Sequence, residues 1–296
     1  MNFLRNIKNR VKFLIKESWY KNPLIIWYSI TPSFILPKNR RWVNNYLEKK
    51  GFLKQNEKEK SFQLKDLKIF YNDRLPTGDI VSILLSRNSS VKNNFLNNSL
   101  TDFESSYELE GVKLEENDIV IDAGANIGSF SIFASKIIGK NGLVFSFEPI
   151  EETYSLLNKN VKINNTMNVQ TIPCALGDIN IEVDFFVNTD KLVSSSSEIQ
   201  GENTLIKKVR QITLDSFLSE KPHINKINFI KVDIEGAERK FLDGAKNTIQ
   251  KHKPKIAICI YHLPDDPEVI ERKIKTFVPE YKITKNKTKL YAWVEK

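Results

Sequence analysis

The segment 118–130 combines residue types that can bind a polar ligand. A short apolar run of strand length, 119–121, is followed by an acid, small residues and two glycines, and then by an apolar helix pattern. Gly124 lets the turn bend without a Cβ clash. The start of the helix offers unpaired backbone N–H groups to a ligand. The segment therefore predicts a strand, a tight turn and a helix, with a binding site at the turn.

Other polar side chains follow later predicted strands. Glu148 comes directly after one strand, the pair Asp233 and Glu235 after another, and His262 after a third. Ligands of open α/β sheets bind beyond these carboxyl ends of the strands. A carboxylate there can accept hydroxyl hydrogen bonds, and two acids or a histidine can remove a proton from a hydroxyl. The pattern favours a binding site next to an acid–base site.

The elements that carry these residues alternate between strand and helix. Such alternation predicts an α/β fold with a mostly parallel sheet and helices on both faces. Two C-terminal strands are expected to close the sheet as an antiparallel hairpin. The predicted strands are 119–121, 143–147, 169–174, 227–232, 255–261, 281–284 and 290–294, with extra strands at 183–187 and 209–212; the predicted helices are 129–138, 151–164, 214–218, 237–250 and 266–278.

Five motifs in this order resemble the FkbM-type family of S-adenosylmethionine-dependent methyltransferases. They are DAGANIGSFSIFA from Asp122, FSFEP from Phe145, CALGD from Cys174, TLDSF from Thr213 and KVDIEGAE from Lys231. The resemblance covers about 107–261. It implies a Rossmann-like class I methyltransferase domain, with S-adenosylmethionine as cofactor and a small-molecule or glycan acceptor.

The resemblance also implies which residues bind the cofactor. Glu148 is expected to bind the ribose hydroxyls, unless it is a surface acid or an acid at the start of the next helix. Asp122 is expected to order the loop and face the methionine amino end, while Asn126 either caps the helix or binds the cofactor carboxylate. The expected set is Asp122, Gly124, Ala125, Asn126, Gly128, Glu148, Cys174 and Ala175, the last two beside the adenine or simply suited to a tight strand end.

The expected catalytic residues are Asp233, Glu235 and His262. One of them would accept the proton of the acceptor hydroxyl. Alternatively, Glu235 caps the next helix, Asp233 binds the methionine end of the cofactor and His262 is a core or capping residue. The same three residues with Asp266 could instead surround Mg²⁺, but their spacing is not a metal signature, and no metal ligand is predicted.

The positive charge is concentrated at the N-terminus. The net charge is +9, but residues 1–60 hold 14 Lys/Arg and 4 Asp/Glu, whereas the remainder holds 31 and 32. Leu4, Ile7, Val11 and Leu14 lie at helical spacing among these cations, which predicts a basic amphipathic helix. Residues 1–36 could contact an anionic membrane surface, or the stripe could pack on the main domain or on a second subunit. The near-neutral remainder argues against a nucleic-acid groove.

Together these features predict an arm and linker over 1–60, with 51–62 as the linker, and a methyltransferase domain over 61–296 with its core at 107–296. Cys174 and Cys259 are expected to be buried free thiols, which are typical of a reducing compartment. The protein is therefore expected in the cytoplasm, where it could also lie peripherally at the inner face of the membrane. The predicted reaction is O-methylation of a saccharide, glycolipid or related metabolite. The alternatives are a non-catalytic cofactor-binding scaffold and an RNA methyltransferase tethered by the arm. The oligomeric state is not predicted.

Overall fold

A computed structural model describes residues 43–45, 47–49, 51–64, 66–72, 75–87, 106–109, 111–188, 195–196 and 204–295. The chain divides into two compact units, 1–53 and 54–296. In the first unit, residues 43–45 and 47–49 are helical, and Val43 and Leu47 are buried. The predicted amphipathic arm, 1–36, lies outside the described residues. No helix in the described part combines the length and apolar character needed to cross a bilayer.

The second unit is built on a seven-stranded sheet. Its strand order is β13-β14-β12-β11-β4-β5-β6, and all strands are parallel except β14, which is antiparallel to both of its neighbours. This confirms the predicted class I methyltransferase fold with a C-terminal hairpin. The strands are β4 (Ile119–Ala123), β5 (Leu143–Phe147), β6 (Val169–Ile172), β11 (Phe229–Val232), β12 (Lys255–Cys259), β13 (Lys282–Lys285) and β14 (Lys289–Trp293).

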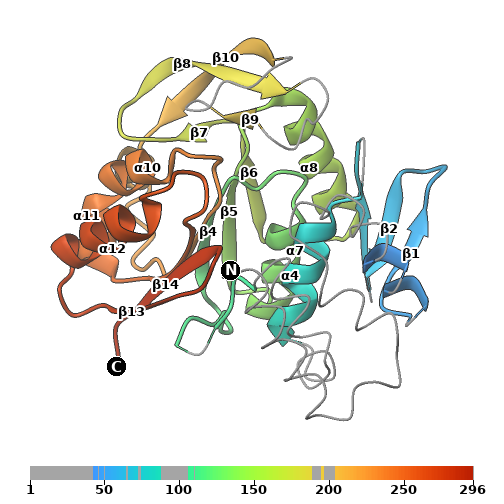
Figure 1. Ribbon diagram of the computed structural model, residues 1–296, viewed down its shortest axis with the longest axis horizontal. Helices are drawn as coiled ribbons and strands as arrows, with labels where there is room; N and C mark the ends of the chain where they lie inside the picture. Colours follow the sequence, from blue (N-terminus) through green and yellow to red (C-terminus); the bar gives the residue numbers. More distant parts are fainter. Residues whose placement is uncertain are drawn as a thin grey trace, which may run out of the picture. The chain divides into compact units, whose positions relative to one another are not determined.

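Helices cover both faces of this sheet, and the two sets lie on opposite sides of it in Figure 1. One face carries α4 (Thr77–Arg87), α7 (Ser129–Ile138) and α8 (Glu151–Ile163), and the other carries α10 (Glu238–Gly244), α11 (Lys246–His252) and α12 (Asp266–Phe277). Because both faces are covered, the central strands read as nearly continuous apolar runs. All four residues of β11 are buried, and Lys231 is the charged one among them.

A second, four-stranded sheet has the order β7-β10-β8-β9. Its strands are β7 (Ala175–Leu176), β8 (Ile181–Asn188), β9 (Ser195–Ser196) and β10 (Thr204–Ile212), and α9 (Leu214–Ser219) follows it. The prediction of one strand over 169–174 was wrong, because β6 ends at Ile172 and Ala175 pairs with Gln211 of β10 instead. Pro173 separates the two strands, and a proline has no N–H to continue a ladder.

The predicted helix over 237–250 was also wrong, since it is two helices. The break is at Ala245, where φ is −114° and ψ is 5°, and where the N–H donates to Leu242 O rather than four residues back. Gly244 faces a close backbone approach, because a Cβ there would lie 1.9 Å from Gly177 O. The break therefore brings the helix pair up against the loop after β7.

A three-stranded antiparallel sheet precedes this core. It contains β1 (Lys54–Asn56), β2 (Ser61–Leu64) and β3 (Leu67–Phe70), so residues predicted as a linker form strands. Asn160 of α8 and Asn164, the residue that caps the end of this helix, bind the backbone of β3. Asn160 Oδ1 accepts from Phe70 N at 2.8 Å and its Nδ2 donates to Phe70 O at 2.9 Å, while Asn164 makes the same pair of bonds with Lys68 at 3.0 and 2.7 Å. Asn160 Nδ2 also donates to Ile127 O at 2.8 Å. The small sheet is thereby joined to the glycine-containing loop.

Candidate active site

The loop between β4 and α7 has an unusual backbone. Gly124, Asn126 and Gly128 all have positive φ, at 77°, 51° and 89°. A Cβ on Gly124 would lie 1.9 Å from Asp233 O, so only glycine allows the loop to meet the end of β11. Gly128 precedes α7, whose first turn has no side-chain cap, so the alternative that Asn126 caps this helix was wrong. Ser129 Oγ at the helix start is buried and has no hydrogen-bond partner among the described residues.

Glu148 follows β5 and fixes the same loop. Its Oε2 accepts the Asn126 N–H and its Oε1 accepts the Ile150 N–H, each at 3.0 Å. The residue is 7% exposed. Burial raises the pKa of Glu148 to about 7, although the two N–H bonds oppose that change. The carboxylate lies at the loop as predicted, and each of its oxygens keeps a lone pair for a further donor.

Asp122 lies beneath the loop as part of a buried ion pair. Its Oδ1 is 3.0 Å from Lys231 Nζ, and its Oδ2 accepts from Ser131 Oγ. Lys231 Nζ also donates to Gly124 O at 2.6 Å. Burial opposes the charge of Lys231, but Asp122 and Asp233 raise its pKa above the ordinary value. Sequence reasoning missed Lys231, although a lysine within an otherwise apolar strand was the available signal.

Cys174 and Ala175 lie where β6 gives way to β7, and both are buried. Burial raises the pKa of the Cys174 thiol. Cys259 is buried too, and both cysteines are free, as predicted. Glu148 N donates to Ile172 O at 3.1 Å, which brings the end of β6 next to Glu148.

Asp233 follows β11 and is held as an anion. Tyr107 OH donates to its Oδ2 at 2.6 Å, and Tyr261 OH lies 3.5 Å from its Oδ1. Burial alone would raise the pKa of Asp233, but the charges of Lys231, His262 and Lys289 and the Tyr107 hydrogen bond hold it below the ordinary value. An acid with a lowered pKa accepts hydrogen bonds well but is a weak proton acceptor.

Glu235, two residues later, differs from Asp233. It has a φ of 56°, in the left-handed region that side chains other than glycine rarely adopt. Its side chain is 33% exposed. Burial is the main cause that raises the pKa of Glu235, and the Asp233 charge adds to it. Backbone strain and a raised pKa in one residue are typical of functional sites.

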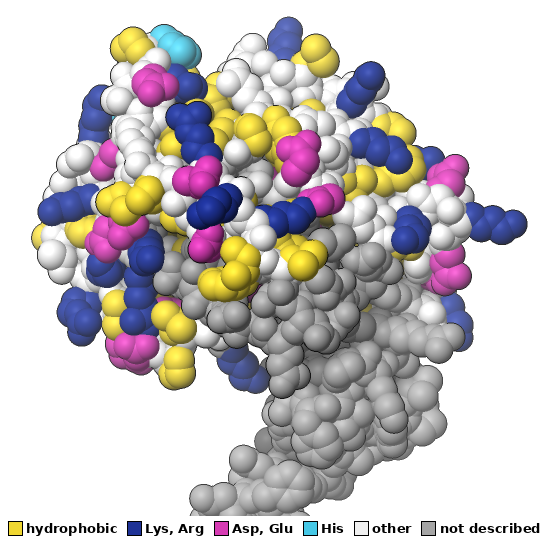
Figure 2. Space-filling model, turned by 90° about the horizontal axis from the view of Figure 1, so that it is seen from above, with side chains coloured by type: hydrophobic (Ala, Val, Ile, Leu, Met, Phe, Trp, Pro, Cys, Tyr) yellow, Lys and Arg dark blue, Asp and Glu magenta, His cyan; other side chains and the backbone are white. Residues whose placement is uncertain are grey.

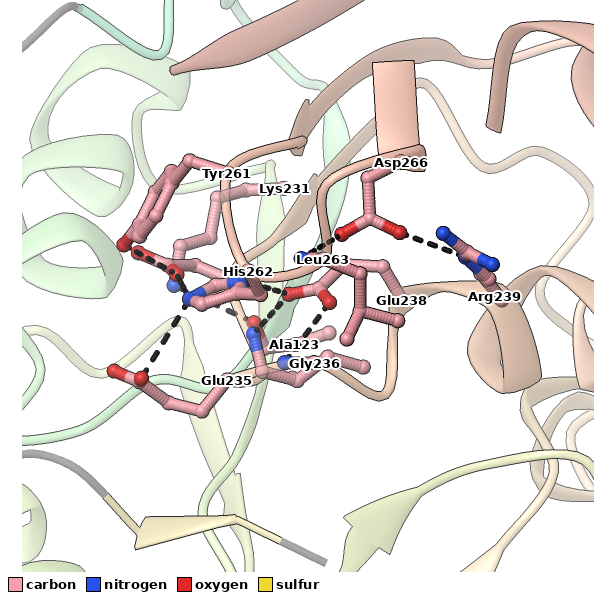
Figure 3. Close-up of polar contacts among 12 residues, drawn as sticks. Ala123, Lys231, Glu235, Gly236, Glu238, Arg239, Tyr261, His262, Leu263 and Asp266 are labelled. Atoms are coloured by element: carbon pink, nitrogen blue, oxygen red, sulfur yellow. Dashed lines mark hydrogen bonds and ion pairs between the residues drawn. The ribbon is translucent and has the colours of Figure 1, made fainter. Parts of the chain in front are cut away.

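His262 lies among three carboxylates, two of which, those of Glu235 and Glu238, are labelled in Figure 3. Its Nε2 is 3.5 Å from Glu235 Oε2 and 3.9 Å from Asp233 Oδ1, and its Nδ1 is 3.0 Å from Glu238 Oε1. Burial opposes protonation, but the bonds to the two glutamates and the nearby charges raise the pKa of His262 to about 10. The three predicted catalytic residues thus lie together, with the imidazole as the central cation.

Sequence reasoning missed Glu238, although the residue closes the KVDIEGAE motif. Asp233, Glu238 and His262 each place a ligand atom within 4.8 Å of the others, close enough for a metal ion. Both Glu238 oxygens already accept backbone N–H groups, from Ile234 and Gly236. In addition, His262 Nδ1 lies 3.0 Å from Glu238 Oε1. We therefore interpret the group as an ion-pair cluster.

Asp266, the fourth residue of the alternative Mg²⁺ set, lies apart from this cluster. It accepts from Arg239 Nε at 2.7 Å and from Leu263 N at 2.8 Å, and Figure 3 shows its carboxylate between these two partners. These bonds stabilise the turn that leads into α12. Asp266 therefore has a structural position.

Tyr107, from the segment before β4, lies over the same strand ends. Its ring is 5.4 Å from Lys231 Nζ and 4.3 Å from Lys289 Nζ, and it packs edge-on against Phe130 at 5.2 Å. Tyr291 OH donates to Ser106 O, which anchors this segment to β14. On the face shown in Figure 2, basic and acidic side chains of the described part are interspersed, without a continuous basic stripe.

Comparison with known proteins identifies a family. A family model described as the methyltransferase FkbM domain matches residues 122–281. Methyltransferase 1 of Beauveria bassiana is 30% identical over 147 residues, which cover 44% of this chain and 59% of that protein. Hexuronic acid methyltransferase AglP of Haloferax volcanii is 26% identical over 172 residues, covering 58% and 67%.

The crystal structure of methyltransferase FkbM from Methylobacillus flagellatus aligns with a TM-score of 0.47 and 23% identity, over 61% of this chain and 44% of that one. The chain spans less than two thirds of the length of the Beauveria relative. The family model, in contrast, covers more than half of the chain. This chain therefore belongs to the FkbM family of S-adenosylmethionine-dependent methyltransferases.

Proposed function

We propose that the whole protein transfers a methyl group from S-adenosylmethionine to a hydroxyl of a saccharide, glycolipid or related metabolite. One observation carries the proposal: the loop that would hold the cofactor meets the acid cluster, since a Cβ on Gly124 would lie 1.9 Å from Asp233 O. A related protein is a hexuronic acid methyltransferase by name, which supports a sugar acceptor.

The residues around the loop fit the cofactor. Glu148 is a buried carboxylate whose pKa is raised to about 7 by burial, so donors such as ribose hydroxyls would stabilise its anionic form. Ser129 Oγ is a buried polar atom without a partner in the described part of the chain. Gly124, Ala125, Asn126 and Gly128 would surround the methionine end above Asp122, and Cys174 and Ala175 would flank the adenine.

Proton removal from the acceptor is assigned to Glu235. Bound S-adenosylmethionine supplies a methyl group on a sulfonium, which an oxygen nucleophile can attack in line. Glu235 is one-third exposed, and burial together with the Asp233 charge raises the pKa of its carboxyl. A carboxylate with a raised pKa, open to solvent beside the loop, is suited to accept the hydroxyl proton.

Asp233 and His262 have supporting roles in this proposal. Asp233 is held as an anion by Lys231, His262 and Lys289 and so provides a fixed negative charge for donors and cations of the ligands. His262, with its pKa raised to about 10 by the surrounding carboxylates, keeps its proton near neutral pH. Its Nε2, 3.5 Å from Glu235 Oε2, then holds the Glu235 carboxylate in place.

The test is methyl transfer by the purified full-length protein. Labelled S-adenosylmethionine would be offered with a panel of saccharides that includes glucuronic acid glycosides, and products would be identified by mass spectrometry. We expect a mass gain of one methyl group on a defined sugar hydroxyl. Glu235→Gln should lower turnover by about 10²–10⁴-fold and leave cofactor binding intact. Cofactor binding without transfer to any member of the panel would count against a saccharide acceptor and would favour a binding scaffold.

A further inference from the structure

Glu238 joins two segments that the chain brings together at the end of the sheet. It is fully buried at the start of α10. Its Oε1 accepts from Ile234 N and its Oε2 from Gly236 N, each at 3.0 Å. These two N–H groups flank Glu235, the strained residue with a φ of 56°. The Glu238 carboxylate therefore fixes the backbone on both sides of Glu235.

The same carboxylate also faces His262. Glu238 Oε1 is 3.0 Å from Nδ1, whereas Nε2 on the opposite edge of the ring faces Glu235 Oε2 at 3.5 Å. Figure 3 shows Glu235 and Glu238 on different sides of the imidazole. The Tyr261 ring covers His262 with a centroid distance of 4.1 Å. The Nδ1–Oε1 contact and the Tyr261 ring hold the imidazole between them, with Nε2 directed at Glu235.

We propose that Glu238 is a positioning residue, which orients His262 through Nδ1 and the Glu235 backbone through two N–H bonds, so that Nε2 and the Glu235 carboxylate are held together. This inference rests on the proposed function, in which Glu235 removes the acceptor proton. Glu238 is itself 0% exposed, so its side chain is not open to a reactant. It acts through its two neighbours only.

Charged groups on or next to three elements, β11, α10 and β14, face this unit. Asp233 and Glu235 follow β11, Glu238 begins α10, and Lys231 of β11 and Lys289 of β14 act on Asp233. The two lysines hold Asp233 as an anion, and the three carboxylates hold the imidazole as a cation. Loss of the Glu238 charge should therefore weaken the retention of the His262 proton without changing the Lys231–Asp122 pair.

The experiment is a titration of the three histidines by NMR in the full-length protein, with histidine labelled and His262→Gln used to assign its signal. In the wild type we expect His262 to stay protonated through neutral pH, unlike a histidine in water. In Glu238→Gln, which keeps the side-chain size, we expect its titration midpoint to fall by about 1–3 units. Turnover should fall by up to about 100-fold, with the Kd for S-adenosylmethionine unchanged.

Asp215→Asn is the matched control. Asp215 also accepts two backbone N–H groups at a helix start, from Asn247 at 3.0 Å and Thr248 at 2.8 Å, but it does not contact His262. This variant should lower stability and leave the His262 midpoint and turnover unchanged. Three outcomes would each overturn the inference. They are a His262 midpoint near 6.5 in the wild type, an unchanged His262 midpoint in Glu238→Gln, and a lowered midpoint in Glu238→Gln with normal turnover. Failure of the proposed function would differ, because wild-type protein would bind the cofactor and transfer no methyl group while the titration stayed as expected.

Discussion

The Tyr107 hydroxyl donates to Asp233 Oδ2 at 2.6 Å across 126 residues of sequence. Tyr107 precedes the segment that the family model matches, 122–281, yet it contacts the residue at which the loop and the acid cluster meet. The candidate site therefore extends into the segment before β4.

Tyr107→Phe should lower turnover at saturating cofactor by about tenfold or more, because Asp233 loses a bond that fixes its position. The free energy of unfolding should fall by about 1.5–3 kcal/mol, the range for a hydrogen bond to a charged group. Tyr281→Phe is the matched control, since it removes one buried bond, to Pro254 O at 2.7 Å, away from the candidate site. Equal turnover in the two variants, measured by steady-state kinetics, would show that Tyr107 has only a structural role.

Glu148→Ala should weaken S-adenosylmethionine binding by about 1–3 kcal/mol through lost charged hydrogen bonds. Isothermal titration calorimetry measures the change directly. Glu151→Ala, which removes an exposed acid from the first turn of α8, controls for the effect of charge on the helix and should bind normally. A folded Glu148→Ala protein with wild-type affinity would remove the ribose assignment.

The protonation of His262 predicts how stability depends on pH. Its pKa is raised from 6.5 to about 10 in the folded protein, so its contribution is complete below pH 6.5 and is lost as pH rises towards 10. Over that range the free energy of unfolding should fall by about 1.4 kcal/mol per pH unit more steeply in wild type than in His262→Gln. Urea unfolding at several pH values gives both slopes. Parallel slopes would mean that His262 is neutral in the folded protein.

Asn160→Ala and Asn164→Ala separate stability from binding. Each substitution removes the hydrogen-bond partner of one N–H and one C=O group of β3. The free energy of unfolding should fall by about 1–3 kcal/mol for each group that is left without a partner. Asn160 also binds Ile127 O in the glycine-containing loop, so this variant alone should weaken S-adenosylmethionine binding. Thermal unfolding and calorimetry on both variants test this. Normal cofactor affinity in a folded Asn160→Ala protein would show that the loop holds its shape without that bond.

Most of the sheet could be predicted because buried parallel strands are continuous apolar runs, and strands β4, β5, β11 and β12 stand out in that way. The glycine-containing loop after β4 could be located because its glycines occupy positive-φ positions that the residue type reveals. Breaks caused by tertiary contacts could not be predicted. The end of one helix at Ala245 depends on the approach of Gly177, which is far away in sequence.

The sequence located the acids and the histidine of the candidate site, but not the residues that contact them. Asp233, Glu235 and His262 lie together because each follows a strand. The residues that contact these acids do not follow a strand: Lys231 lies inside one, Glu238 begins a helix and Tyr107 belongs to the segment before β4. A search for polar residues after strand ends therefore does not find them. Glu238 in particular resembles an ordinary acid in the first turn of a helix until its contact with His262 is seen.

Asn160 of α8 and Asn164 at the end of this helix also have a consequence for solubility. β3 is an edge strand, and such edges recruit strands from other molecules through unpaired N–H and C=O groups. Amides spaced four residues apart on the helix saturate the outward groups of Lys68 and Phe70, which are spaced two apart on the strand. The two amides thus take the place of the next strand at Lys68 and Phe70, where no second molecule can then pair with the backbone.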